Sequence, residues 1–125
     1  MLYHIDPRNA KGEKDELKVQ VAYRNKMRTV APGIMLAGVP NAGKRSAWEA
    51  RQRAKEGLVR GFPDIIALHD ERAAFLEFKS GTGYPSDQQI ETLNRLHKLG
   101  FAVGIFRSAE TAIEWTRQQF PDAFL

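Results

Sequence analysis

Two strand-like apolar segments, residues 64–69 and 73–80, are separated by a tight polar turn around Asp70-Glu71. Segments of this kind with so short a connection are typical of antiparallel neighbours in a β-hairpin. If the hairpin is symmetric about the turn, Asp64 lies opposite Glu77. A four-residue loop keeps this register, whereas a loop one residue longer or shorter would break it. The hairpin constrains the fold more than any other part of the chain.

Asp64 and Glu77 would then be carboxylates opposed across neighbouring strands. Directly opposed side chains have Cβ atoms about 4.5–5.5 Å apart, and like charges there destabilise a sheet. A divalent cation between them would remove the conflict. The chain has no cysteine and only 3 histidines, which are scattered, so oxygen donors and Mg²⁺, Mn²⁺ or Ca²⁺ are favoured. The lack of cysteine also excludes disulfides, thiolate zinc sites and thiol nucleophiles, and fits a cytoplasmic location.

Lys79 is two residues from Glu77 and therefore projects from the same face of the strand, while Leu76 and Phe78 point to the opposite, core-facing side. A lysine beside metal-binding carboxylates can orient or help to deprotonate an attacking water and offset charge on a phosphate. The alternative is a solvated ion pair on a surface hairpin. Asp64 in the opposing register favours the catalytic interpretation.

The rest of the pattern predicts an α/β fold, a mixed central β-sheet flanked by helices, in a single domain over residues 1–125. The first helix is expected over residues 12–30, with apolar positions at Leu17, Val21, Tyr23 or Arg24, Met27 and Val30. Further helices are expected from Ser46 to Glu56, from Ser86 to Gly100 and from Ser108 to Gln118, and further strands over residues 34–37 and 101–106.

Charge is distributed unevenly along the chain. Residues 1–60 carry +7 and residues 61–125 carry −3, which suggests a cationic binding face beside an acidic site, although a solvated helix explains the basic half almost as well. Basic residues surround an aromatic one in a cluster that can bind DNA phosphates and stack on a base: Lys44, Arg45, Trp48, Arg51, Arg53 and Lys55. Trp48 as the core anchor of a short helix is an equal alternative.

Two other classes of protein are disfavoured. Residues 38–44 match GxxxxGK, but Arg45 stands where a phosphate-binding loop needs Ser or Thr, so we expect no nucleoside triphosphate. No apolar run approaches the roughly 18 residues of a membrane span, and the N-terminus lacks the pattern of a signal peptide. We therefore expect no membrane partner.

Pro63-Asp64 followed by Glu77-Phe78-Lys79 resembles the signature of the PD-(D/E)xK nuclease superfamily. Across nearly the whole chain the sequence is similar to the VRR-Nuc family, the virus-type replication-repair nucleases. The matching pieces are Glu16-x-x-x-Gln20, Asn41, Gly61-Phe62-Pro63-Asp64, residues 75–79, Ser86-x-x-Gln89 and residues 100–107. Pro85 departs from the family, in which a leucine commonly precedes the serine.

The resemblance implies a restriction-endonuclease-like core and a Mg²⁺- or Mn²⁺-dependent nuclease acting on branched, Holliday-junction-like or flap DNA as a homodimer. It implies that Asp64, Glu77, Glu16 and the main-chain carbonyl of Phe78 hold the metal, that Lys79 is catalytic and that Gln89 completes the site. Restriction, exonucleolytic trimming or an inactive DNA-binding module are the alternatives. Ser86 with Gln89 is also an ordinary capping box, and Glu16 lies in a charged segment that could simply be solvated.

Overall fold

The computed structural model describes residues 3–40 and 47–125, without the side chains of Ala47, Ala50 and Arg53. The predicted residues Asn41, Lys44, Arg45 and Ser46, and the side chain of Arg53, lie outside this description. Among the described residues no helix is long and apolar enough to cross a bilayer.

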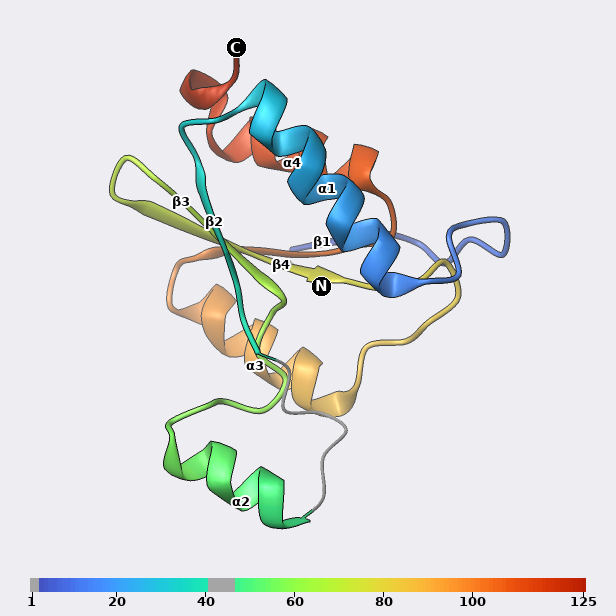
Figure 1. The fold of residues 1–125 in the computed structure, drawn as a ribbon, viewed down its shortest axis with the longest axis vertical. Coiled ribbons are helices and arrows are strands. Elements are labelled where there is room, and N and C mark those ends of the chain that lie inside the picture. The colour runs from blue at the N-terminus through green and yellow to red at the C-terminus, as the bar shows by residue number, and fades with distance from the viewer. Residues whose placement is uncertain (1–2, 41–46) are drawn as a thin grey trace.

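A mixed five-stranded sheet in the order β1-β5-β4-β3-β2 forms the centre of the fold (Figure 1). Its strands are β1 (His4–Ile5), β2 (Met35–Gly38), β3 (Ile65–His69), β4 (Arg72–Phe78) and β5 (Ala102–Phe106). β5 runs parallel to β1 and β4, while β4, β3 and β2 are successively antiparallel. The predicted α/β architecture is confirmed, and β5 lies in the interior of the sheet. β1 is an addition that the sequence did not reveal, because two residues carry no periodicity.

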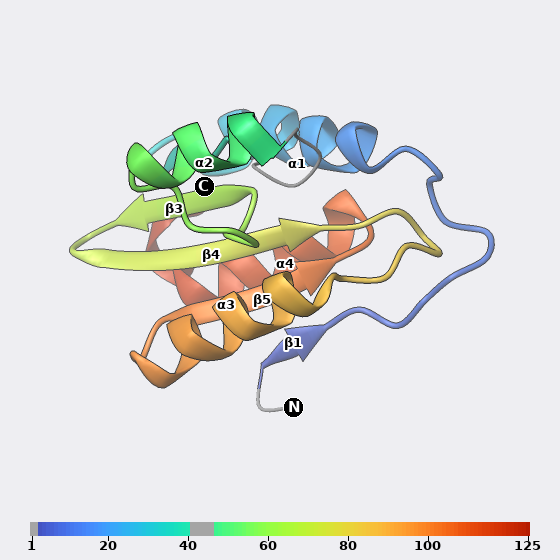
Figure 2. The same cartoon turned by 90° about the horizontal axis from the view of Figure 1, so that it is seen from below.

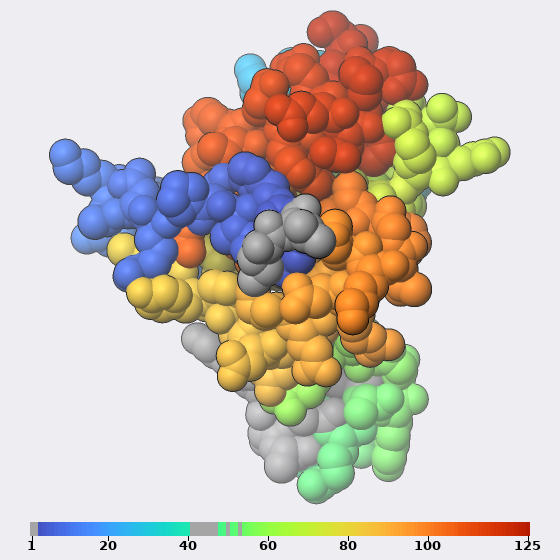
Figure 3. Space-filling model, turned by 180° about the vertical axis from the view of Figure 1, so that it is seen from behind, coloured from blue at the N-terminus to red at the C-terminus, as the bar shows by residue number. Residues whose placement is uncertain are grey.

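Helices cover both faces of the sheet. α1 (Glu16–Val30) and α4 (Ala109–Gln119) lie on one face, and α3 (Asp87–Lys98) lies on the other (Figures 1 and 2). α2 (Ala47–Lys55) extends beyond α3, away from the sheet, and Figure 3 shows it projecting from the body. A short 3₁₀ turn, Pro121–Ala123, follows α4.

The hairpin of β3 and β4 has the predicted register, with Ile65 opposite Leu76 and His69 opposite Arg72. Asp70 and Glu71 form a two-residue turn with φ values of 47° and 63°. A two-residue turn with positive φ at both positions matches the right-handed twist of the strands that it joins. Aspartate adopts a positive φ more readily than most residues. Asp64 immediately precedes Ile65, the first residue of β3, and Glu77 immediately follows Leu76, so the same register places Asp64 opposite Glu77.

Two predictions for α1 are wrong. The helix begins at Glu16 rather than residue 12, because the side chain of Asp15 accepts the N–H of Leu17 at 3.0 Å and caps it. The buried face consists of Val19, Tyr23 and Met27, a spacing of four residues, whereas Leu17 is 61% exposed. Of the predicted positions Tyr23 and Met27 are buried, but Leu17 is two residues from Val19, about 200° around the helix, and so faces away from the core.

Gly61 lets the segment before β3 approach the start of α3. Its φ is +73°, and a Cβ there would lie 2.6 Å from the backbone nitrogen of Gln89 and closer still to the Gln88 carbonyl. The Arg60 carbonyl accepts the hydroxyl of Thr92 at 2.8 Å, which fixes the same approach. Only glycine fits, so this contact joins the segment that carries Asp64 to the helix that carries Gln89.

We expect Gly61→Ala to lower the free energy of unfolding by roughly 2–5 kcal/mol, because it combines a left-handed backbone with overpacking. Gly57 is a matched control, since it has φ +82° with nothing within 4 Å of the position that a Cβ would take. Gly57→Ala should cost only about 1 kcal/mol. Urea denaturation of both variants measures the difference, and equal losses would contradict the close contact at Gly61.

Candidate active site

Three carboxylates from separate elements converge at one end of the sheet. Glu16 is the first residue of α1, Asp64 immediately precedes β3, and Glu77 lies near the end of β4. Each offers one carboxylate oxygen, and these three oxygens all lie within 4.8 Å of one another. The side chain of Asp64 also accepts the N–H of Phe78 at 2.8 Å, which anchors it across the hairpin.

Lys79 faces this cluster from the residue after β4. Its Nζ lies 3.7 Å from Oε2 of Glu77 and 3.9 Å from Oε2 of Glu16, and its side chain is only 11% exposed. Leu76 and Phe78 lie in the core under α1 and α4, as the strand alternation predicted. The ammonium group is therefore held among the carboxylates, and the alternative of a solvated surface ion pair is wrong.

Gln89 combines the capping box with a contact to the carboxylate cluster, and its part in catalysis stays a prediction. It completes the capping box of α3, in which its side chain accepts the N–H of Ser86 and its own N–H donates to the Ser86 hydroxyl. Its Nε2 also donates to Oε2 of Glu77 at 3.0 Å. The capping geometry fixes the amide so that its donor points at Glu77.

Burial and mutual repulsion oppose ionisation of the cluster. Desolvation, together with the charge of Asp64 and, to a smaller extent, that of Glu16, raises the pKa of Glu77 to about 9, although Lys79 acts in the other direction. Desolvation also raises the pKa of Asp64, and the Phe78 N–H and Lys79 lower it. One lysine therefore does not compensate the carboxylates.

The donor set fits a hard divalent cation. Oε1 of Glu77 is buried and has no hydrogen-bond partner among the described residues, and a buried unpaired carboxylate oxygen is costly. Carboxylate oxygens are the ligands that Mg²⁺ and Mn²⁺ prefer. Asp64, Glu77 and Glu16 are thus able to hold such an ion. Ligation by the main-chain carbonyl of Phe78 stays a prediction.

Two of the three carboxylates, Glu16 and Asp64, line an open pocket of about 710 Å³, whereas Glu77 is buried. Besides Asp64, Glu16, Lys79 and Gln89, the lining includes Leu17, Gln20, Val39, Arg60, Gly61, Tyr84 and Gln88. Leu17, one of the apolar positions in the predicted helix pattern, is therefore an exposed part of this pocket. No described residue of α2 lines it, so Arg51 and Lys55 lie outside the pocket.

α2 presents an aromatic and basic surface. Trp48 is 63% exposed, so its interpretation as a core anchor is wrong. Arg51 and Lys55 are exposed as well. These are the described side chains of the basic cluster that the sequence indicated, and their role in binding DNA stays a prediction.

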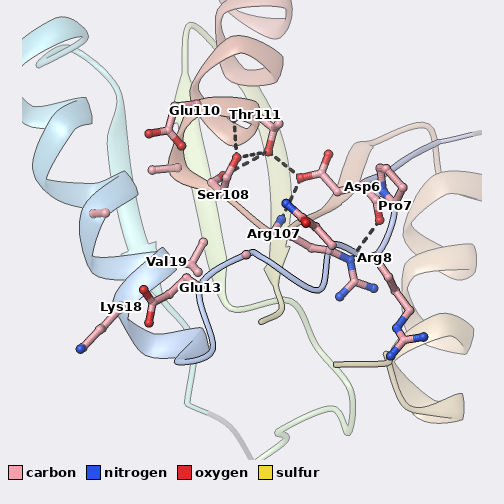
Figure 4. Close-up of a pocket in the computed structure, with 14 residues that line it drawn as sticks. Asp6, Pro7, Arg8, Glu13, Lys18, Val19, Arg107, Ser108, Glu110 and Thr111 are labelled. Atoms are coloured by element: carbon pink, nitrogen blue, oxygen red, sulfur yellow. Dashed lines mark hydrogen bonds between the residues drawn. The ribbon is translucent and has the colours of Figure 1, made fainter. Parts of the chain in front are cut away.

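A second open pocket, of about 750 Å³, lies between α1 and the start of α4 (Figure 4). Acidic and basic side chains alternate around it, among them Glu13, Lys18 and Glu110. The other pocket is the better candidate for an active site, because carboxylates converge there beside a buried lysine.

Arg107 at the edge of this second pocket holds the loop that follows Lys79. Its Nη1 donates to the carbonyls of Ser80 and Gly83 at 2.6 and 2.7 Å, and its Nε donates to the carbonyl of Asp6 at 3.1 Å. Asp6 in turn accepts from Thr111 and from the backbone N–H of Arg107 (Figure 4). No local pattern indicated this network, since Asp6 and Arg107 lie 101 residues apart.

We predict that Glu77→Gln stabilises the metal-free protein at alkaline pH. The pKa of Glu77 is raised on folding to about 9, above about 4.3 in an unfolded chain. The folded state therefore binds more protons between these values, and stability falls as pH rises through this range. In chelator, the Tm of the variant should exceed that of the parent by several degrees at pH 8.5, with a smaller difference at pH 5.5.

The same melting experiment with Mg²⁺ or Mn²⁺ should reverse the order, because the parent binds the cation more tightly. Glu114→Gln is the matched control, since the Glu114 side chain is 64% exposed and pairs only with Arg117 among the described ion pairs. If the Tm of the parent and that of Glu77→Gln change equally with pH and with metal, the raised pKa of Glu77 and its part in cation binding are both contradicted.

Comparison with known proteins gives a structural match. No family model matches the chain, and no curated protein sequence matches it significantly. A solved structure described as a "VRR_NUC domain protein" superposes with a TM-score of 0.70 at 21% identity, covering 89% of this chain and 91% of that one. The resemblance indicated by the sequence is confirmed at the level of the fold. The chain has the α/β fold of a VRR_NUC domain protein.

Proposed function

We propose that the protein is a metal-dependent endonuclease of the VRR-Nuc family that hydrolyses phosphodiester bonds in branched DNA. One observation carries the proposal: a nearly buried lysine, Lys79, lies within 4 Å of two carboxylates that form a ligand cluster with Asp64. In a chain with the fold of a VRR_NUC domain protein, this constellation is suited to phosphodiester hydrolysis. The substrate is a four-way junction or a flap.

Asp64, Glu77, Glu16 and the carbonyl of Phe78 would hold Mg²⁺ or Mn²⁺. The bound cation would polarise the phosphate and lower the pKa of a coordinated water. Lys79 orients the attacking water and offsets the charge that develops on the phosphate. Gln89 holds the Glu77 carboxylate in place through its amide. Water attacks phosphorus in line as the bond to the 3′ oxygen breaks, leaving a 5′-phosphate and a 3′-hydroxyl.

DNA phosphates would bind to α2. α2 belongs to the connection between β2 and β3. Val39, near the start of this connection, and Arg60, near its end, both line the pocket that contains Glu16, Asp64 and Lys79. The N–H of Val39 donates to the carbonyl of Asp64 at 2.9 Å, which fixes one end of the connection next to the carboxylate cluster. DNA held by Lys44, Arg45, Trp48, Arg51, Arg53 and Lys55 would therefore pass close to the carboxylates. Nothing in the sequence resembles a base-reading motif, so structure is recognised over sequence.

A homodimer fits this substrate. Two copies of the domain about a two-fold axis would cut two strands of a four-way junction symmetrically. The cysteine-free sequence and a DNA substrate favour the cytoplasm as the place of action.

We expect Lys79→Ala to lower cleavage by at least about 100-fold, because the attacking water loses its orienting group. Four-way junction, flap, nicked and linear duplex DNA are incubated with Mg²⁺ or Mn²⁺ and with chelator, and products are mapped on denaturing gels. Lys98→Ala, an exposed lysine at the far end of α3, is the control. If no DNA is cut with either metal, or if Lys79→Ala cuts like the parent, the proposed function is wrong. Paired symmetric cuts in the junction would indicate resolution by a dimer.

Replacement of both Arg51 and Lys55 by alanine should weaken binding to every DNA to a similar degree. Each lost phosphate contact reduces the slope of log K against log salt by about 0.9 for duplex DNA. Fluorescence anisotropy at several salt concentrations, with chelator present to prevent cleavage, measures this slope for the parent and the variant. Arg95 and Lys98 on α3 are a matched exposed basic pair. A slope that changes equally with either pair would argue against α2 as the DNA-binding surface.

A further inference from the structure

Tyr84 places an exposed aromatic ring at the acidic pocket. The residue is 69% exposed and lines the same pocket as Asp64, Lys79 and Gln89. A large aromatic side chain that stays in water contributes little to the stability of the fold. Its position is therefore not explained by packing of the core.

The ring is backed on one side by a guanidinium group. Cζ of Arg8 lies 4.2 Å from the centroid of the Tyr84 ring, and Nε of Arg8 donates to the carbonyl of Thr82 at 3.0 Å. The arginine is thus tied to the loop that carries the tyrosine. With one face of the ring covered and most of the side chain exposed, the ring presents its other surface to solvent.

The loop beneath Tyr84 is held on several sides. Arg107 donates to the carbonyls of Ser80 and Gly83, and the N–H of Gly83 donates to the hydroxyl of Ser80 at 2.9 Å. Pro85 follows and restricts the backbone of Tyr84 to extended conformations. A ring fixed in this way loses little conformational entropy when a flat ligand stacks on it.

The neighbouring groups suit a nucleotide. Arg60 and the apolar Leu17, both exposed, line the same pocket. A nucleotide offers a phosphate to the charged part of the site and a flat base to an aromatic ring. Base–aromatic stacking tolerates any sequence, because every base has a π face.

We propose that Tyr84, backed by Arg8, is a stacking platform for an unpaired nucleobase next to the bond that is cut. This inference rests on the proposed function and names its substrate class. A base inside a duplex must be unstacked at a cost before it reaches the ring, whereas a base at a branch point or flap already lacks a neighbour. The platform thus selects branched or single-stranded ends over continuous duplex.

A comparison of protein and DNA variants tests the platform. The cut positions of the parent are mapped, and substrates are made with an abasic residue at each nucleotide flanking the cut. Tyr84→Ala should lower kcat/KM about 5- to 150-fold on the intact substrate, the range expected for the loss of one stacked base. On the DNA that is abasic at the stacked position, parent and Tyr84→Ala should cut equally.

Two further variants separate stacking from other effects. Tyr84→Phe keeps the ring and should keep the discrimination between intact and abasic DNA. Leu99→Ala removes another exposed apolar side chain, 72% exposed at the end of α3, about 18 Å along the helix from its first residue. It should behave as the parent on both DNAs. Equal loss for Tyr84→Ala on intact and abasic substrates, or no loss on either, would overturn the platform and leave the nuclease proposal standing.

A binding measurement decides the question if no DNA is cut. The probe is a flap or junction with 2-aminopurine at the branch point, bound in chelator. Parent and Tyr84→Phe should quench its fluorescence by stacking, and Tyr84→Ala should bind without this quenching. Quenching without cleavage would support the platform while overturning the nuclease. Equal quenching by all three proteins, or no binding of any DNA, would overturn the platform.

Discussion

Repulsion between Asp64 and Glu77 is the constraint on which the rest of the site depends. The hairpin register brings these carboxylates together at the end of the sheet, and burial denies them the water that would screen them. Glu16 arrives from α1 and adds to the repulsion, while Lys79 offsets only part of it. A fold under no other demand would place neutral residues here. Like charges are normally kept apart in a sheet, and exceptions are expected at functional sites. Oε1 of Glu77, which has no hydrogen-bond partner among the described residues, lies within this exception.

The arrangement persists because the neighbouring segments are fixed independently of the charges. On one side, the absence of a side chain at Gly61 lets the segment before Asp64 lie against the backbone of Gln88 and Gln89. On the other, Arg107 binds carbonyls of the loop that follows Lys79. These contacts are short, buried or sterically demanding, and none involves Glu16, Asp64 or Glu77 directly. The scaffold can therefore hold the carboxylates in a geometry that their charges oppose.

The sequence predicted the parts of this structure that depend on local patterns. Hairpin register, the alternation of Glu77 and Phe78 and the capping box of Ser86 with Gln89 follow from periods and turn lengths, so they could be read directly. The buried face of α1 could be read only in part, because apolar residues lie on opposite sides of the helix: Val19 is buried, whereas Leu17, about 200° around the helix, is exposed. The partnership of Asp6 with Arg107 also escaped, since nothing in a single sequence relates residues so far apart. Long-range polar contacts of this kind become visible only in three dimensions.

The uneven charge along the chain has a more specific meaning in the folded protein. The proposed binding and cutting do not simply divide between the basic N-terminal half and the acidic half, because Glu16, from the basic half, joins the carboxylate cluster. The two proposed sites differ instead in their distance from the sheet: the carboxylates and Lys79 lie at its end, and α2 projects beyond it (Figure 1). Yet α2 is reached through Val39 and Arg60, which both line the acidic pocket. A duplex lying along α2 would thus be directed toward the carboxylates, and Tyr84 would meet it where a strand leaves the duplex.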